Sequence, residues 1–182
     1  MLSSFELLDV FFKLIIALGL GSIIGFEREF HKHPGGLCTH VLVTMGSTIY
    51  TLVSIKIVPE SDGSYRGDIG RIAAQIVTGI GFIGAGTIYK SNDIIKGLNT
   101  AASIWASASI GMAVGSGLLE LALMSSLMIL LVLSINNFYR KRIRRKRKKL
   151  CRENSSSNTI IPCSNEEYNN DSNEEYNNDD NN

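Results

Sequence analysis

The sequence predicts an all-α membrane protein, a bundle of about five transmembrane helices followed by a disordered C-terminal tail. Up to residue 139 the chain consists of long apolar segments separated by short polar loops. Its charges are also segregated, with 8 basic and 9 acidic residues in 1–139, 10 basic and no acidic in 140–152, and 8 acidic and no basic in 153–182. We therefore expect a transmembrane domain at 1–139, a basic juxtamembrane segment at 140–152 and an acidic, Asn-rich tail at 153–182.

Five segments approach the roughly 20 residues that a helix needs to cross the hydrocarbon core. They are residues 7–26, 37–57, 71–89, 98–117 and 118–139. The first is interpreted as a retained span, because Glu6 and Asp9 precede it in place of the basic cluster of a secretory signal. Only Gly115-Ser-Gly117 joins the last two, which predicts a tight helical hairpin or a tilted or re-entrant segment.

The distribution of basic residues predicts the orientation in the membrane. With five spans, one side carries Arg28, Lys32, Lys90, Lys96 and the ten basic residues of 140–152, and the other carries Lys13, Lys56, Arg66 and Arg71. Basic residues mark the cytoplasmic side. We expect a multi-pass plasma-membrane protein with its N-terminus outside and its C-terminus in the cytoplasm.

The two C-terminal regions are interpreted from their composition. The run 140–152 is typical of a topology anchor at the anionic inner leaflet, and it lacks the interleaved aromatic residues of a nucleic-acid site. The tail contains a tandem octad, 164–171 and 172–179, with too little apolar content to fold. The cysteines Cys38, Cys151 and Cys163 share no metal-ligand spacing, so no cofactor is expected.

Small residues recur at helical spacing in three of the expected spans. In the third span, Gly79-Ile-Gly81-Phe-Ile-Gly84 matches the spacing of a dinucleotide-binding motif, but no strand precedes it. Close helix packing explains these glycines better, because one helix face carries Gln75, Gly79, Phe82 and Gly86. The expected partner is a stripe in the fourth span: Asn99, Ser103, Ser107, Gly111 and Gly115. The residues expected at helix contacts are Gly21, Gly25, Gly79, Gly81, Gly84, Gly86, Gly111 and Gly115.

Ionisable residues at the span ends are candidates for function, because charge is costly in a bilayer. Glu27 and Arg28 close the first span, and Asp68 and Arg71 open the third on the opposite side. A purely structural interpretation, with Asp68 as a helix N-cap and Arg71 as a snorkelling anchor, is as good as the functional one. No nucleophile–base pair or metal motif stands out, so we expect no enzyme, and whether magnesium binds is open.

Five motifs in fixed order resemble the MgtC/SapB family over about residues 15–135. They are Gly25-Phe-Glu-Arg-Glu29, Gly36-Leu-Cys-Thr-His40, Arg71-Ile-Ala-Ala-Gln75, the glycine run 79–86, and the segment from Lys96 to Trp105. The resemblance implies a membrane protein linked to growth under magnesium limitation and, in some bacterial pathogens, to survival inside host cells. Its motif positions carry the candidate functional residues Glu27, Arg28, Asp68, Arg71, Gln75, Asn99 and Thr100.

The resemblance implies two functions. The leading hypothesis is a regulator of another membrane protein, such as the proton-driven ATP synthase, and the alternative is a magnesium transporter or transport accessory subunit. The expected partners are the lipid bilayer and another membrane protein, with a homo-oligomer and magnesium left open. Two features depart from the family: the folded cytoplasmic domain of longer members is replaced by the basic run and the repeats, and Cys38 stands where Arg is frequent.

Overall fold

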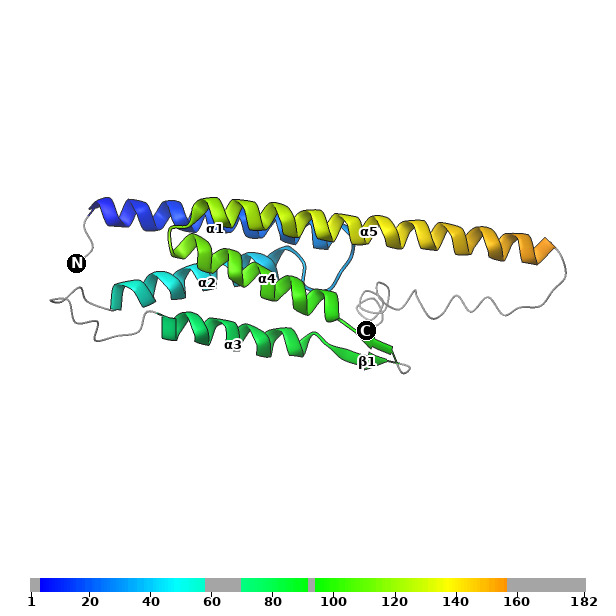
Figure 1. Ribbon diagram of the computed structural model, residues 1–182, viewed down its shortest axis with the longest axis horizontal. Helices are drawn as coiled ribbons and strands as arrows, with labels where there is room; N and C mark the ends of the chain where they lie inside the picture. The colour runs from blue at the N-terminus through cyan, green and yellow to red at the C-terminus, as the bar shows by residue number, and fades with distance from the viewer. Residues whose placement is uncertain (1–3, 58–69, 92–93, 157–182) are drawn as a thin grey trace, which may run out of the picture. The chain divides into compact units, whose positions relative to one another are not determined.

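The computed structural model describes residues 4–57, 70–91 and 94–156. The chain divides into two compact units, Met1–Leu130 and Leu131–Asn182. The described residues form five α-helices: α1 (Ser4–Phe30), α2 (Leu37–Ile57), α3 (Gly70–Gly86), α4 (Leu98–Gly115) and α5 (Leu119–Ser156) (Figure 1). The predicted all-α class is confirmed.

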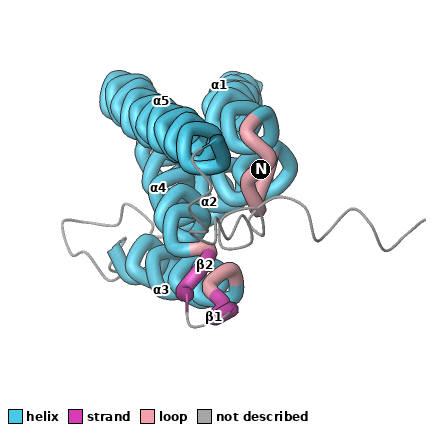
Figure 2. Tube along the Cα trace, turned by 90° about the vertical axis from the view of Figure 1, so that its right-hand side faces the viewer, coloured by secondary structure: helices cyan, strands magenta, loops and turns pink. Residues whose placement is uncertain are grey.

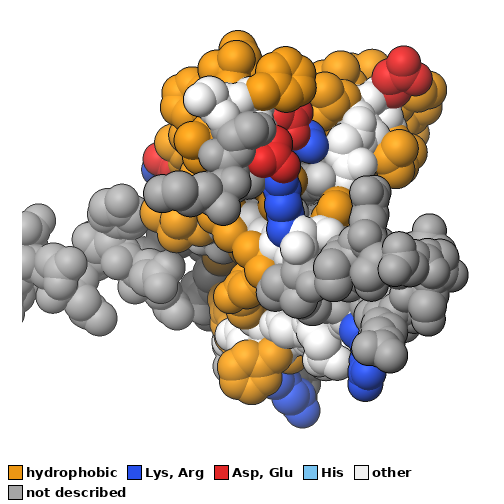
Figure 3. All heavy atoms as spheres, turned by 90° about the vertical axis from the view of Figure 1, so that its left-hand side faces the viewer, with side chains coloured by type: hydrophobic (Ala, Val, Ile, Leu, Met, Phe, Trp, Pro, Cys, Tyr) orange, Lys and Arg blue, Asp and Glu red, His pale blue; other side chains and the backbone are white. Residues whose placement is uncertain are grey.

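Three stretches of these helices are long and apolar enough to cross a membrane: Ser4–Phe30, Leu37–Lys56 and Leu119–Tyr139. The apolar part of α3, Ala73–Gly86, is shorter. Large apolar side chains are exposed along the helices, and some of them are visible in the end-on view of Figure 3. Several Ser and Thr side chains are buried instead. This distribution suits a protein whose surroundings are lipid.

In the first unit, α2 packs against both α1 and α4, and α3 packs mainly on α4. Figure 2 shows α2 and α4 between α1 and α3. An apolar cluster of Val43, Ile76, Ile80, Ile104 and Ala108 joins α2, α3 and α4. The α1–α2–α4 group therefore forms the centre of this unit, and α3 is attached to one side of it.

A small β-hairpin follows α3, where the sequence predicted that the helix would continue to residue 89. Helix α3 ends at Gly86, and strands β1 (Tyr89–Ser91) and β2 (Ile94–Lys96) pair antiparallel, with Tyr89 opposite Lys96 (Figure 2). Gly97 then has φ +86°, and a Cβ there would lie 1.8 Å from the carbonyl oxygen of Thr87. Only glycine fits this return of the chain to α4.

The connection between α4 and α5 is a tight turn, as in the first of the two alternatives that the sequence left open. Leu118 N–H donates to the carbonyl of Ala113 and Gly117 N–H to that of Val114, a Schellman arrangement with Gly117 at φ +81°. Helix α5 then runs through the basic segment 140–152 and residues 153–156, which were expected in the tail. The octad repeats lie outside the described residues, so their disorder stays a prediction.

Candidate functional site

Arg28 and Thr100, two of the candidate functional residues, meet inside the first unit. Arg28 lies in the last turn of α1 and is only 1% exposed. Its Nη2 donates a hydrogen bond of 2.8 Å to Oγ1 of Thr100, in the first turn of α4, 72 residues away. A buried guanidinium requires hydrogen-bond acceptors, since the protein interior does not replace its hydration. The structure thus ties α1 to α4 at a charged group.

His40 and Ser103 extend this contact to α2. The His40 ring is fully buried, with Nδ1 3.0 Å from the carbonyl oxygen of Gly36 and Nε2 3.1 Å from Oγ of Ser103. Ser103 Oγ also lies 2.9 Å from the carbonyl oxygen of Thr100. Arg28, His40, Thr100 and Ser103 form one hydrogen-bonded group, called the polar cluster below. It joins α1, α2 and α4.

Sequence reasoning did not select His40 or Ser103 as functional residues. His40 was noted only as the last letter of a motif, and Ser103 only as part of a packing stripe. The sequence does contain a signal for His40, because a histidine one turn into an apolar span is costly unless another span supplies a hydrogen-bond partner. Which span supplies it is a matter of packing.

The loop between α1 and α2 covers the polar cluster. Gly35 has φ +69°, and a Cβ there would lie 3.0 Å from Cγ2 of Thr100 and 3.9 Å from Cε1 of His40. Glu29 Oε2 accepts a hydrogen bond of 2.9 Å from the N–H of Leu37 and so caps the first turn of α2. Glu27 Oε1 lies 3.3 Å from His31 Nδ1.

The remaining candidate residues lie apart from this cluster. Arg71 and Gln75 are exposed on α3, and Asn99 is exposed on α4. Within 4–57, 70–91 and 94–156 they form no hydrogen bond or ion pair with the polar cluster. Asp68 lies outside the described residues. The structure therefore joins Arg28 to Thr100 and leaves Arg71, Gln75 and Asn99 at the surface.

Four of the eight expected packing glycines lie at tight contacts with α2. A Cβ at each would approach a specific atom: Gly21 to 3.0 Å from Thr44 Oγ1, Gly25 to 2.6 Å from Leu37 Cα, Gly111 to 2.2 Å from the Thr44 carbonyl oxygen, and Gly115 to 2.7 Å from Thr51 Cβ. Real Cβ atoms essentially never come as close as the distances at Gly25, Gly111 and Gly115, and 3.0 Å at Gly21 is tighter than most real contacts. Helices α1 and α4 therefore lie against α2 because these positions lack side chains.

The expected pairing of the α4 stripe with α3 is wrong. Gly111 and Gly115 meet α2, and Ser103 bonds His40 of α2. Helix α3 meets α4 through Gly84, whose Cβ would lie 3.5 Å from Cβ of Ala101 in ordinary contact. Among the residues that the structure describes, Gly79, Gly81 and Gly86 would find no atom within 4 Å of an added Cβ. These three glycines are not used for packing inside the described chain.

Hydroxyl groups follow the buried face of α2. Thr44 donates to the carbonyl of His40 at 2.8 Å, and Thr51 to that of Ser47 at 2.8 Å. Thr48 lies 2.9 Å from the carbonyl oxygens of both Thr44 and Gly111, the second of them on α4. These hydroxyls use backbone acceptors, mostly in their own helix, which allows polar side chains in a bundle without charge.

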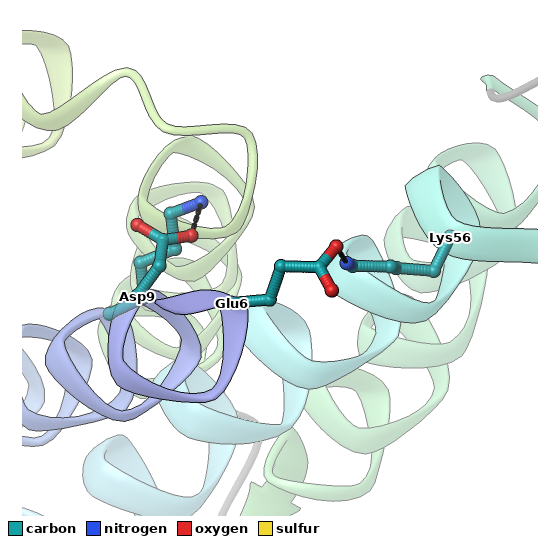
Figure 4. A network of polar contacts seen from close by, with 4 residues as sticks. Glu6, Asp9 and Lys56 are labelled. Atoms are coloured by element: carbon teal, nitrogen blue, oxygen red, sulfur yellow. Dashed lines mark hydrogen bonds and ion pairs between the residues drawn. The ribbon is translucent and has the colours of Figure 1, made fainter. Parts of the chain in front are cut away.

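Two ion pairs lie at the opposite end of α1. Glu6 pairs with Lys56 of α2, and Asp9 pairs with Lys13 in the next turn at 2.8 Å (Figure 4). Such pairs contribute little to stability in contact with water. In the described part of the chain, no three His, Cys, Asp or Glu side chains are grouped so as to hold a metal ion.

Residues 14–142 match the model of the MgtC family, and this range contains the whole polar cluster and the glycine contacts. The chain belongs to the MgtC/SapB family. The resemblance seen in the motifs is thereby confirmed.

Three curated relatives illustrate the similarity. The chain is 47% identical over 125 residues to "Putative magnesium transporter YhiD" of Escherichia coli K12, covering 68% of this chain and 58% of the relative. It is 44% identical over 126 residues to "Protein SapB" of Bacillus subtilis, covering 68% and 54%. It is 44% identical over 118 residues to "Protein MgtC" of Salmonella typhimurium LT2, covering 65% and 48%. The chain thus spans roughly half of these relatives, and no solved structure matches it.

Proposed function

We propose that this chain is a non-enzymatic membrane protein that supports growth at low magnesium by binding and regulating another membrane protein through α3. Membership of the MgtC/SapB family supports the link to magnesium, since one relative is named a putative magnesium transporter. The proton-driven ATP synthase is the partner that the family resemblance implies.

The observation that carries this proposal is the uncovered face of α3 that carries Gly79 and Gly86. These two glycines would meet no described atom within 4 Å of a Cβ, whereas Gly21, Gly25, Gly111 and Gly115 are all used inside the bundle. Phe82, between these glycines, is 84% exposed. Small residues let the backbone of another helix approach closely, and a neighbouring aromatic ring adds contact area. The face suits a helix from another protein.

The alternative is a magnesium transporter or transport accessory subunit, which the name of the YhiD relative favours. A conduit needs space for an ion that keeps several of its waters. Between α2 and α4 the backbones are in contact instead, because a Cβ on Gly111 would lie 2.2 Å from the carbonyl oxygen of Thr44. This close contact along the buried polar face of α2 supports regulation over conduction.

The proposal is tested by placing leucine on α3 and on a matched position elsewhere. Gly79→Leu should insert at normal abundance, because no described atom lies within 4 Å of its Cβ, and it should impair growth in low magnesium. Gly19→Leu on α1, which is equally open, should insert and grow like the parent. Arg71→Ala, at the exposed start of α3, should also insert and fail to support growth.

Normal growth of both α3 variants at normal membrane abundance would refute a role for this face. Magnesium uptake by liposomes that contain only the purified chain would instead establish the transporter. Growth is compared with membrane abundance in each case, because loss of the protein alone would also impair growth.

A further inference from the structure

We propose that His40 is a proton-operated switch, in which a second proton on its ring turns the Ser103 hydroxyl and breaks the hydrogen bond between Arg28 and Thr100. The polar cluster would then have two states, one with α1 tied to α4 through Arg28 and one with Arg28 displaced toward the covering loop. The switch does not depend on which membrane protein the chain contacts.

The hydrogen bonds of the polar cluster differ between the neutral and the charged His40 ring. Nδ1 of His40 faces the carbonyl oxygen of Gly36, which only accepts, so Nδ1 carries a proton in both states. In the neutral ring Nε2 is an acceptor, and the single hydroxyl proton of Ser103 points to it at 3.1 Å. When Nε2 takes a proton from water, it donates to Ser103 Oγ, and Ser103 donates to the carbonyl of Thr100 at 2.9 Å.

The charges around His40 determine which bond breaks. Arg28 and Glu27, both of α1, are the charged groups that act on it, and α4 presents only the hydroxyls of Ser103 and Thr100. A charged His40 ring would bond Ser103, and the Arg28 guanidinium would bond Thr100, one helical turn away on α4. Two cations that bond neighbouring turns of one helix repel each other where little water screens them. The tied state in the structure is therefore expected with a neutral ring.

Arg28 is the group that can move. It lies in the last turn of α1, and its flexible stem can carry the guanidinium toward water at the loop. Glu27, the adjacent residue, offers a carboxylate on that side, which already faces His31 at 3.3 Å. The loop at Gly35 closes over the buried His40 ring, so the ring gains its proton when this loop opens.

The test follows His40 and Arg28 together in the full-length chain, with isotope-labelled histidine and arginine in lipid nanodiscs, by NMR between about pH 5 and pH 8. The His40 ring should change from the neutral to the charged pattern, and the Arg28 Nε–H signal should shift with the same midpoint. His40→Gln should abolish the Arg28 shift, and Ser125→Ala, on α5, should leave it unchanged.

Three results would overturn the switch. They are a His40 ring that keeps one form over the whole range, an Arg28 signal that stays constant while His40 titrates, and an Arg28 shift that survives in His40→Gln. Ser103→Ala tests the same mechanism if His40→Gln does not fold. It removes the acceptor of the charged ring, whose hydrogen bond is worth more than that of the neutral ring, so the His40 transition should move to lower pH. An unmoved transition would refute the role of Ser103.

Discussion

A single buried charge organises one end of the helix bundle. Arg28 is 1% exposed and reaches across to Thr100 on α4, although both positions were first selected as motif residues at span ends. At the residue scale the motif thus has a physical function, because the buried guanidinium of α1 is held by the Thr100 hydroxyl of α4. His40 and Ser103 complete that arrangement through atoms that only the folded chain brings together.

Thr100→Val should destabilise the bundle by about 1.5–3 kcal/mol, because it removes a neutral acceptor from a buried cation. In an Arg28→Met background, which keeps the long side chain and removes the charge, the same substitution should cost much less. Unfolding of the four proteins of this double-mutant cycle in detergent measures the coupling. Equal costs in both backgrounds would mean that the Arg28–Thr100 bond contributes nothing to stability.

At the scale of elements, α2 is the helix around which the first unit is built. Glycines of α1 and α4 approach its backbone, and its own hydroxyls bond mostly within the helix. Helix α3 differs, since its apolar residues Ile76 and Ile80 face the bundle and its open glycines face away. The two kinds of glycine therefore predict different responses to an added methyl group.

Gly111→Ala should destabilise the protein by about 1–3 kcal/mol, because the new Cβ would lie 2.2 Å from the Thr44 carbonyl oxygen and the helices must separate. Gly79→Ala, with no described atom within 4 Å, should be neutral or stabilising by up to about 1 kcal/mol, since alanine favours the helix. Thermal unfolding of the two variants beside the parent tests this contrast, and a similar loss in both would contradict the helix contacts described.

For the whole molecule, the exposed apolar side chains and buried hydroxyls are arranged as expected for a chain surrounded by lipid. The polar cluster and the Glu6–Lys56 pair lie at opposite ends of α1. The two ends of the bundle therefore differ, with a covered, buried charge at one and an exposed ion pair at the other. Which end faces the cytoplasm is a prediction from the basic residues.

A reporter fused after Leu150 should lie in the cytoplasm, because ten basic residues follow the last span and short basic segments are retained on the cytoplasmic side. A reporter inserted in the loop at His33 should give the same result, and one placed before Ser4 should behave as external. An external signal at either of the first two positions would overturn the predicted topology.

The sequence by itself determined that there are five helices in the described chain and, to within a few residues, where α2, α3 and α4 begin and end, because the length of an apolar segment is a local property. It left the connection between α4 and α5 as one of two alternatives, and α5 continues well past the predicted end at residue 139. The hairpin of β1 and β2 was missed, since two strands of three residues leave hardly any periodic pattern.

Only the tertiary structure decided which helix faces which. Periodicity shows that α4 has a stripe of small residues, but a stripe of this kind fits α2 and α3 equally well, and the structure places Gly111 and Gly115 against α2. In the same way a histidine in an apolar span signals a partner without naming it, and the partner of His40 is Ser103, on another helix. Helix contacts depend on the rotation and order of the helices in space, which residues distant in the chain determine together.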